Sequence, residues 1–456
     1  MRIKNFEQLL SNAVTPSLWR LRKLALNSFD YALGAISPQI LLKSRLRFAD
    51  NCLRIDQHSF DFDQFKNIYV IGGGKATGDM TLAVEQILDG CLTRGCVNIP
   101  HEMRCSTNVV LLNRAGHPVP DEAGVCGVRQ MVELAEQAGC DDLVICLLSG
   151  GGSSLMPLPR GTLSLADKKE LTAMLLKSGA SINEINTVRK HISDFKGGWL
   201  ARRAYPATVL NLILSDVIGD PLDFIASGPT VPDSTTFADA VEVLQRYHLW
   251  GEAPDAVIQL LTAGCRSAIE ETPKAHDPAF ERVFNCIVGN NRSALSAVGA
   301  SLSANGIKTV LLPTAMSGDA AELGRYLAGR ALEISRSDET VAIIAGGEAT
   351  VRVRGGGRGG RNQELALAAV ERLSGIDNVL LAALATDGID GPTDACGAIV
   401  DGYTLAAAQR RGLDPEQFLQ NNDAYNFFNA LGELVVTGYT GSNVNDIYIL
   451  LAAASD

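Results

Sequence analysis

The stretch VIGGGKATG at residues 70–78 decides the fold class, because an apolar run turns through three glycines and a lysine into a helical pattern. A strand that passes into a helix in so few residues begins a βαβ unit. The turn brings backbone N–H groups and the cation of Lys75 to a helix N-terminus, which favours an anion. We therefore expect Lys75 to contact a phosphate or carboxylate, with Gly73 and Gly74 beside it in a substrate site. A solvated lysine at the start of a helix is the alternative.

The same stretch completes neither of two common nucleotide-binding motifs. Ala76 follows the lysine, so the Walker A pattern is absent. Thr77 holds the last glycine position of GxGxxG, and no acidic residue ends the next apolar run at Val97. The sequence therefore disfavours a dinucleotide cofactor, which needs both features.

Similar apolar runs alternate with helical patterns along most of the chain. The runs are nearly continuous, which is typical of strands that are covered on both faces. We expect an α/β fold with mostly parallel sheets. The expected strands span residues 68–71, 109–112, 143–148, 208–214, 286–288, 309–312, 341–345, 379–385 and 447–451.

A chain of 456 residues is long enough for two or three domains. The segment ETPKAHDPAFE at residues 271–281 contains two prolines and has no apolar period. We place a domain division there, with one domain over residues 1–275 and the other over 282–456. The first 50 residues have a helical apolar pattern, and we expect them to pack on the first domain.

Composition and charge exclude several classes of protein. Hydrophobic residues make up 46% of the chain and charged residues 20%, so disorder is excluded as the dominant state. The net charge of -11 argues against nucleic acid or an anionic membrane as a partner. Neither a signal peptide nor an apolar run of roughly 18 residues is visible. We expect a cytoplasmic protein, a monomer or a homodimer, that binds small molecules.

Cysteine and histidine spacing gives no sign of a zinc site. The ten cysteines contain no CxxC pair, and the six histidines contain no HExxH motif. We interpret the cysteines as buried thiols.

A second glycine loop occurs in LLSGGGSSL at residues 147–155. Glycines and hydroxyls after an apolar strand let a polyphosphate approach the backbone closely. The serine-hydrolase pattern GxSxG is absent, and an ordinary tight turn is the alternative. The candidate nucleotide-binding residues are Ser149, Gly150, Gly151, Gly152, Ser153 and Ser154.

A basic segment, NTVRKHISDFKGG, covers residues 186–198. If it is helical, Arg189, Ser193 and Lys196 share one face. That face is either solvated or binds an anionic ligand beside the glycine loops. We take Arg189 as a candidate substrate-binding residue.

A second basic segment carries four arginines and no acid between residues 352 and 361. Arg352 and Arg354 alternate with valines, so we expect them on one face of a strand, toward solvent or substrate. Arg358 and Arg361 lie in a glycine loop that opens the next helix, where a guanidinium can bind a carboxylate or phosphate bidentately. Arg358 is a candidate for substrate binding, and Arg361 is the stronger candidate for chemistry.

Two acidic loops follow expected strands: SDVIGD at residues 215–220 and ATDGIDGPTD at 385–394. Mg²⁺ binds through one or two carboxylates together with waters and substrate phosphates. Asp216 and Asp387 are therefore candidate ligands of Mg²⁺ or Mn²⁺. Acidic turns are the alternative, because Asp-Gly is common in turns.

Glycine loops for phosphate, arginines for an anion and aspartates for Mg²⁺ together indicate a phosphoryl-transfer enzyme without a Walker motif. The loops also resemble those of a known family, the glycerate 2-kinases whose C-terminal part is called the MOFRL domain. The matching stretches are GGGKA at 72–76, AGHPVPD at 115–121, LLSGGGSSL at 147–155, INTVRKHIS at 185–193, SDVIGDPLDFIASGPTVPD at 215–233, GGEATV at 346–351, GGRNQELAL at 359–367, ATDGIDGPTDACGAIVD at 385–401 and TGSNVNDIYILL at 440–451.

The resemblance implies ATP-dependent phosphorylation of D-glycerate at its 2-hydroxyl, giving 2-phosphoglycerate and ADP. It implies a larger Rossmann-like N-terminal domain, a smaller C-terminal MOFRL domain and an active site in the cleft between them. The family's lysine and arginine match Lys75 and Arg361, which we expect to be catalytic and to come from opposite domains. The resemblance does not identify metal ligands.

Two alternatives remain open. Members of this family are also named hydroxypyruvate reductases, which would use NAD(P)H. A non-catalytic sensor of nucleotides or sugar acids would keep the loops without the chemistry.

Overall fold

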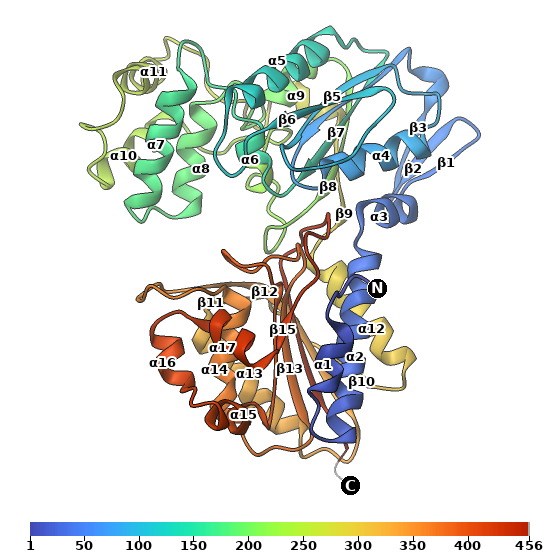
Figure 1. Cartoon of the computed structure of the whole chain (residues 1–456). Helices are drawn as coiled ribbons and strands as arrows, with labels where there is room; N and C mark the ends of the chain where they lie inside the picture. The colour runs from blue at the N-terminus through green and yellow to red at the C-terminus, as the bar shows by residue number, and fades with distance from the viewer. Residues whose placement is uncertain (455–456) are drawn as a thin grey trace. The chain divides into compact units, whose positions relative to one another are not determined.

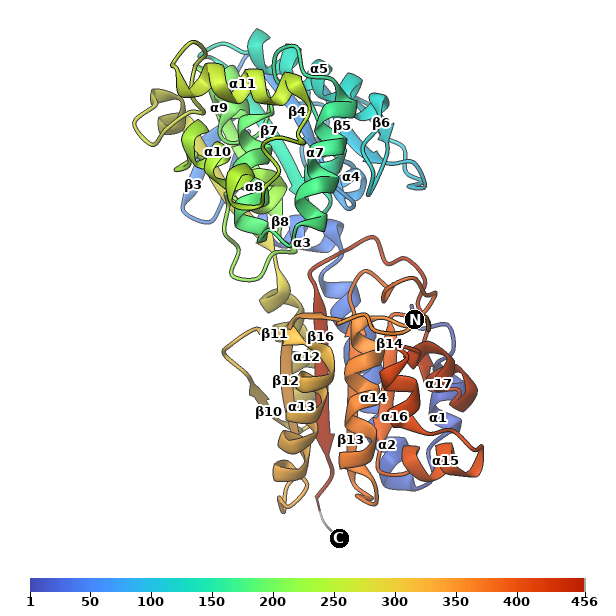
Figure 2. The same cartoon turned by 90° about the vertical axis from the view of Figure 1, so that its left-hand side faces the viewer.

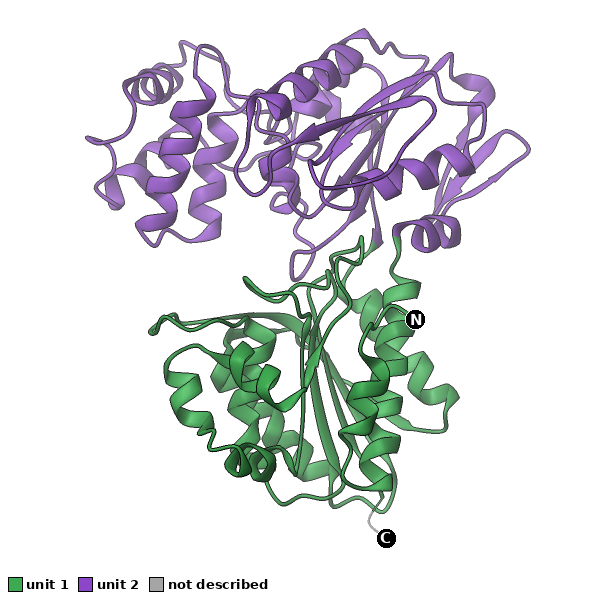
Figure 3. Cartoon of the chain, viewed as in Figure 1, with its two compact units in different colours: residues 1–37, 289–456 green, residues 38–288 purple. Residues whose placement is uncertain are grey.

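The computed structural model describes residues 1–454, which form two compact units (Figure 3). Unit 2 comprises residues 38–288, and unit 1 comprises residues 1–37 together with the chain from Gly289 onward. The chain therefore passes between the units twice. Within the described residues, no helix is both long and apolar enough to cross a membrane.

Unit 2 contains a six-stranded sheet in the order β6-β5-β4-β7-β8-β9. Its neighbouring strands from β6 to β8 pair in parallel. This is the doubly wound order 3-2-1-4-5-6, so the Rossmann-like expectation for the N-terminal half is confirmed. The strands are β4 (Asn67–Gly73), β5 (Arg94–Pro100), β6 (Val110–Ala115), β7 (Asp142–Ser149), β8 (Thr208–Leu214) and β9 (Val283–Gly289).

The strand order reverses between β4 and β7, and ligands of such sheets bind outside the carboxyl ends of the strands at that point. Gly73 pairs with Leu148, and Ser149 pairs with Leu214, so β4, β7 and β8 end at one edge. The two glycine loops and the loop with Asp216 leave the sheet there.

The helices of unit 2 cover the sheet and also form a separate bundle. One buried cluster joins α5, α9 and the strands, and another joins α7, α8, α10 and α11, which Figures 1 and 2 show grouped together. A small antiparallel sheet of β1 (Arg47–Ala49), β2 (Cys52–Ile55) and β3 (His58–Asp61) lies near the start of the unit. The helices are α3 (Pro38–Arg45), α4 (Thr77–Ile87), α5 (Glu122–Gln137), α6 (Gly152–Leu155), α7 (Leu165–Lys177), α8 (Ile182–His191), α9 (Trp199–Ala204), α10 (Phe237–Arg246) and α11 (Asp255–Cys265).

Unit 1 has a seven-stranded sheet in the order β10-β12-β16-β13-β14-β15, with β11 also paired to β12. Only β10 and β11 run parallel to their neighbour β12, and the other pairs are antiparallel. The expectation of mostly parallel sheets is thus wrong for this unit. The strands are β10 (Lys308–Leu311), β11 (Met316–Asp319), β12 (Val341–Thr350), β13 (Val379–Ala385), β14 (Gly397–Asp401), β15 (Leu434–Val435) and β16 (Asp446–Ala452).

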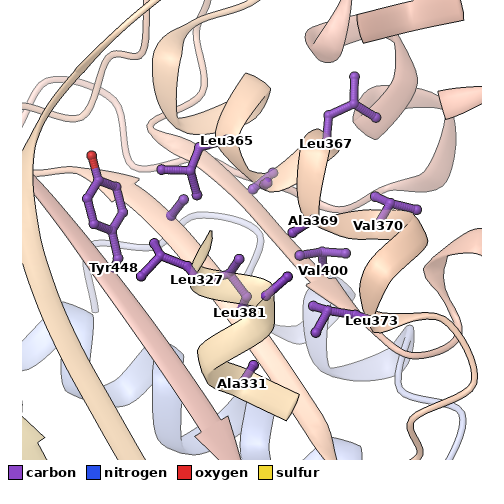
Figure 4. Close-up of a cluster of buried hydrophobic side chains, with 14 of the residues drawn as sticks. Leu327, Ala331, Leu365, Leu367, Ala369, Val370, Leu373, Leu381, Val400 and Tyr448 are labelled. Atoms are coloured by element: carbon purple, nitrogen blue, oxygen red, sulfur yellow. The ribbon is translucent and has the colours of Figure 1, made fainter. Parts of the chain in front are cut away.

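Helices cover both faces of this sheet, so its antiparallel strands are as continuously apolar as parallel ones. Ile343 belongs to a core with α13, α14 and α17. Figure 4 shows part of this core, with Leu327 of α13 and Leu365 of α14. Ile344, the neighbour of Ile343, faces α12, because a Cβ on Gly299 would lie 3.5 Å from Ile344 Cδ1. The helices are α1 (Phe6–Ser11), α2 (Pro16–Ala35), α12 (Asn291–Ala304), α13 (Ala320–Ile334), α14 (Arg361–Leu373), α15 (Thr404–Arg410), α16 (Pro415–Gln420) and α17 (Ala424–Leu431).

The observed division of the chain differs from the expected one in two ways. The segment 271–281 leads directly into β9, the sixth strand of unit 2, so the division falls after Val288. The first helices pack on unit 1, where α2 contacts α12, β13 and β16, and not on the first domain. An ion pair that no local pattern reveals, from Arg22 to Glu433, helps to hold α2 there.

Candidate active site

The two glycine loops of unit 2 are joined by hydrogen bonds at the point where the strand order reverses. The Lys75 N–H donates to the carbonyl oxygen of Gly150 at 2.8 Å. The Ala76 N–H donates to the hydroxyl of Ser149 at 3.0 Å. These N–H groups at the start of α4 are therefore bound within the protein, and the expectation that they bind an anion is wrong. Ser149, only 1% exposed, is a loop-joining residue, a role that the sequence did not predict.

Gly73 and Gly74 are required by this close packing. A Cβ on Gly73 would lie 2.9 Å from Met156 Cγ, and one on Gly74 would lie 2.1 Å from Ser149 Oγ. Both glycines are buried. Their lack of side chains lets the loops approach each other, and this packing accounts for them without the predicted contact to substrate.

Asp216 and Lys75 approach the second glycine loop at adjacent residues. A Cβ on Gly150 would lie 2.0 Å from Asp216 Oδ2, and one on Gly151 would lie 3.3 Å from Lys75 Cγ. Gly151 has a φ of +82°, which a side chain would strain. The structure thus brings together three predicted features: the lysine, the glycine loop and one of the two aspartates.

His117 also lies at this loop, and the sequence reasoning did not single it out. It follows β6, and its Nε2 lies 2.8 Å from the position that a Cβ on Gly151 would take. Burial, and then the positive charge of Lys75, lower the pKa of the imidazole below its ordinary value. The available signal was its place in AGHPVPD, directly after a strand of the same sheet.

A cavity of about 450 Å³ lies beside this loop. Ser153, Ser154, Arg189 and Lys196 line it. Helix α8 ends at His191, so the expectation that Arg189, Ser193 and Lys196 share a helical face is wrong. Arg189 and Lys196 nevertheless both line this cavity. The Lys196 Nζ donates a hydrogen bond to the carbonyl oxygen of Ser153 at 2.7 Å.

Arg361 is the first residue of α14 in unit 1, and two carboxylates fix its side chain. Its Nε donates to Asp446 Oδ2 at 2.6 Å, and its Nη1 donates to Glu348 Oε1 at 3.0 Å. Burial opposes its charge, but these carboxylates outweigh burial and raise the pKa of the guanidinium above its ordinary value. A substitution of Arg361 would leave the fully buried Asp446 carboxylate without its partner, so it would affect the fold as well as any chemistry.

The other arginines of this segment have different surroundings. Arg358 Nε donates to the carbonyl oxygen of Pro392 at 3.1 Å, and its guanidinium stacks 4.1 Å from the Tyr425 ring centroid. Strand β12 ends at Thr350, so Arg352 and Arg354 lie beyond it and the expected strand face is absent.

Asp390 is a buried carboxyl that the sequence reasoning passed over. It accepts hydrogen bonds from the N–H groups of Asn362 at 3.1 Å and Gln363 at 2.8 Å. Burial, and then the neighbouring Asp446, raise its pKa to about 7. It therefore orients the first turn of α14, and with it Arg361.

The second candidate metal residue, Asp387, lies in unit 1 and forms a tight turn. Its Oδ1 accepts from the Ile389 N–H at 3.1 Å. Within residues 1–454, no group of three or more His, Cys, Asp or Glu side chains is arranged to hold a metal. Mg²⁺ needs only one or two carboxylates when phosphates and waters complete its shell, so the Asp216 carboxylate beside Gly150 fits it.

The structure weakens one argument against a dinucleotide cofactor, namely that no acidic residue ends the strand containing Val97. Strand β5 continues past Val97 to Pro100, and the acidic Glu102 follows soon after. The other argument stands, because Thr77 replaces the third glycine and is fully buried at the start of α4. The fingerprint of a dinucleotide site is still incomplete.

Comparisons with known proteins extend over both units. The model of a domain of unknown function, DUF4147, matches residues 24–262, and the MOFRL family model matches residues 341–446. The D-glycerate 2-kinase of Thermotoga maritima is 40% identical over 94% of this chain and 98% of that protein. A putative hydroxypyruvate reductase of Agrobacterium vitis is 38% identical over 94% of each chain.

A solved structure agrees with the sequence comparisons. The crystal structure of glycerate kinase from Thermotoga maritima has a TM-score of 0.84 and 38% identity to this chain. It covers 95% of this chain and 100% of its own. The α/β fold and the resemblance to the MOFRL-type family are thereby confirmed.

Proposed function

The chain belongs to the glycerate 2-kinase family, and from this premise we propose that it transfers the γ-phosphoryl group of ATP to the 2-hydroxyl of D-glycerate. The products are 2-phosphoglycerate and ADP. One observation carries the proposal: relatives named glycerate kinases match this chain along nearly its whole length. The family is thus an enzyme family, and the chain is a kinase rather than a sensor.

We propose that Lys75 and the loop of Gly151, Ser153 and Ser154 bind the phosphoryl group that is transferred. Phosphoryl transfer depends on positioning and on cations that stabilise the charge of the transition state. The joined loops hold the Lys75 backbone in place, so its side chain starts from a fixed position beside Gly151.

We propose that His117 accepts the proton of the glycerate 2-hydroxyl. An imidazole that is neutral at pH 7 accepts a proton, and burial together with Lys75 keeps this imidazole neutral. Its Nε2 faces the same glycine as Lys75 does. No group in residues 1–454 forms a hydrogen bond to the His117 ring, so the ring is available to a substrate hydroxyl.

Asp216 would hold the Mg²⁺ that accompanies ATP. When bound, the ion would neutralise negative charge on the phosphates. Asp387 remains a second proposed ligand, on the argument that its loop is acidic.

Arg361 remains a proposed catalytic residue on unit 1. Asp446 and Glu348 fix its guanidinium, as required of a group that positions an anion. Arg358, exposed on the same loop, remains a proposed substrate contact.

All ten cysteines are free thiols, which suits the reducing cytoplasm where we place the protein. Only Cys96, Cys146, Cys286 and Cys396 are buried, so the expectation of buried thiols holds for these four and is wrong for the others.

The function is tested by assaying purified protein with ATP, Mg²⁺ and D-glycerate, and identifying the product by ³¹P NMR. We expect 2-phosphoglycerate in an amount equal to the ADP formed. A parallel assay with NADH and hydroxypyruvate tests the reductase. Oxidation of NADH without ATP consumption would overturn the kinase, and 3-phosphoglycerate as product would overturn the regiochemistry.

A further inference from the structure

The cavity beside the second glycine loop has two chemically different ends. Its lining comes from α7, from Arg189 on α8, and from residues 118–120, Ser153, Ser154, Pro157 and Lys196. Lys168, Arg189 and Lys196 lie at one end. Leu176, which is 60% exposed, lies two helical turns beyond Lys168 on α7, about 12 Å along the helix axis, so it marks the other end. Val119, also 60% exposed, lies between Pro118 and Pro120 in the same lining. A volume of about 450 Å³ suits a drug-sized ligand rather than a three-carbon acid alone.

The cationic end is short of acidic partners. Lys168 and Lys196 are almost fully buried and donate only to the carbonyl oxygens of Leu158 and Ser153. Within residues 1–454, the half-buried Arg189 guanidinium makes no hydrogen bond or ion pair. Two carboxylates are near: Glu170 at the exposed rim, and Asp194, which acts on Lys168.

Burial and the neighbouring positive charges lower the pKa values of Lys168 and Lys196. Burial, and then Arg189, lower the pKa of Lys168 to about 7. Burial, followed by Lys168 and Arg189, lowers the pKa of Lys196 well below its ordinary value. Buried like charges without partners are costly, so a ligand with several negative charges would stabilise this end.

The apolar end of the cavity favours an uncharged, apolar part of a ligand. Leu176 on α7 and Val119 after β6 both expose aliphatic surface in the lining of the cavity. Ser153 connects the cavity to Gly151, and Gly151 lies beside Lys75. A ligand that spans the cavity therefore has an apolar part outside and phosphates that reach toward Lys75.

We propose that this cavity is the nucleotide site, with the phosphates at Arg189, Lys196 and Ser153 and the base between Val119 and Leu176. This assignment rests on the proposed kinase function and changes the expected role of Arg189 from glycerate binding to nucleotide binding. Glycerate has a carboxylate but no apolar surface, so it would leave the outer end empty.

The test measures binding without turnover. Calorimetry with MgADP, and separately with D-glycerate, is applied to the full-length protein and to Leu176→Ser, Arg189→Met and Arg189→Lys. We expect Leu176→Ser to weaken MgADP roughly five-fold. We expect Arg189→Met to weaken it about ten-fold or more, with partial recovery in Arg189→Lys. Glycerate binding should change less than two-fold in all three, which is within about 0.4 kcal/mol.

The matched control for Leu176 is Ile182→Ser, which removes an exposed aliphatic side chain from the neighbouring helix α8. It should bind MgADP as the wild type does. Greater loss of glycerate than of MgADP in Arg189→Met would assign the cavity to glycerate. Unchanged binding of both ligands in Leu176→Ser and in Arg189→Met would reject the cavity as a site for either. Failure of the kinase function gives a different result: MgADP binds as proposed, yet glycerate is not phosphorylated.

Discussion

The main-chain N–H of Lys75 donates to the carbonyl oxygen of Gly150 at 2.8 Å, so the loop after β4 and the loop after β7 form one structure. The bond involves only backbone atoms and persists when the lysine side chain is replaced. The Lys75 ammonium can therefore be removed without separating the loops.

Lys75→Ala and Lys75→Gln should each lower kcat/KM by about 10²–10³-fold, as loss of one preorganised charge-stabilising group does. Thermal unfolding should stay within a few degrees of wild type. Lys177→Ala, at the exposed end of α7, is the control and should keep full activity. Near-normal kcat/KM for glycerate in both Lys75 variants would remove this residue from the mechanism.

Gly151→Ala should weaken ATP binding more than its loss of stability explains. The new Cβ would lie 2.8 Å from His117 Nε2, in a backbone with φ of +82°. Gly179 has nearly the same φ, +78°, and nothing within 4 Å of a Cβ. Both alanine variants should lose about 1–3 kcal/mol of stability through strain. Calorimetry with MgADP separates them, and equal nucleotide affinity in the two variants would contradict a ligand role for this loop.

Much of the fold could be predicted from local patterns. The runs at 208–214 and 379–385 coincide with β8 and β13, and every other expected strand overlaps an observed one. Strand direction in unit 1 could not be predicted, because helices on both faces make parallel and antiparallel strands equally apolar. The packing of α2 could not be predicted from local patterns either, because its partners α12, β13 and β16 lie far along the chain.

Site residues could be predicted where a charged side chain or a glycine loop comes directly after a strand. Lys75, Asp216 and the loop at Gly151 meet because parallel strands end at one edge. The packing roles of Ser149 and Gly74 could not be predicted, because a glycine or serine needed for close packing looks the same in sequence as one that binds phosphate. His117 was missed because one histidine after a strand carries no spacing pattern.

The metal requirement should depend on Asp216. Asp216→Asn keeps the size of the side chain but removes the charge beside Gly150, so half-maximal activity should need roughly 10-fold more Mg²⁺ or higher. Activity is titrated with MgCl₂ and MnCl₂ at fixed ATP, for Asp216→Asn, Asp387→Asn and the double variant. A double variant with wild-type metal dependence, or full activity in EDTA, would reject both assignments.

Arg22→Met should destabilise unit 1 by about 3–5 kcal/mol, because it leaves two buried carboxylates uncompensated. Arg22 donates to Glu433 at 2.6 Å and to Asp401 at 2.5 Å. Arg20→Ala, two residues before Arg22 on the exposed side of α2, should change stability by no more than about 0.5 kcal/mol. Chemical denaturation measures both variants. Equal stability of the two would mean that α2 does not pack on unit 1 as described.

The pH dependence of turnover should identify His117. Its pKa is lowered, so the ring is neutral at pH 7 and becomes protonated only below its ordinary value of about 6.5. As the proton acceptor of the 2-hydroxyl it works only when neutral, so kcat/KM should be constant near pH 7 and fall as the pH drops through the lowered pKa. His117→Gln should lose about 10²–10⁴-fold in kcat, the usual contribution of a general base, and its remaining activity should lack this acidic limb. Glycerate affinity should change little in this variant, because the imidazole contributes to proton transfer rather than to binding of the carboxylate. An unchanged acidic limb in His117→Gln would show that another group titrates, and loss of glycerate affinity with normal kcat would reassign the ring to substrate binding.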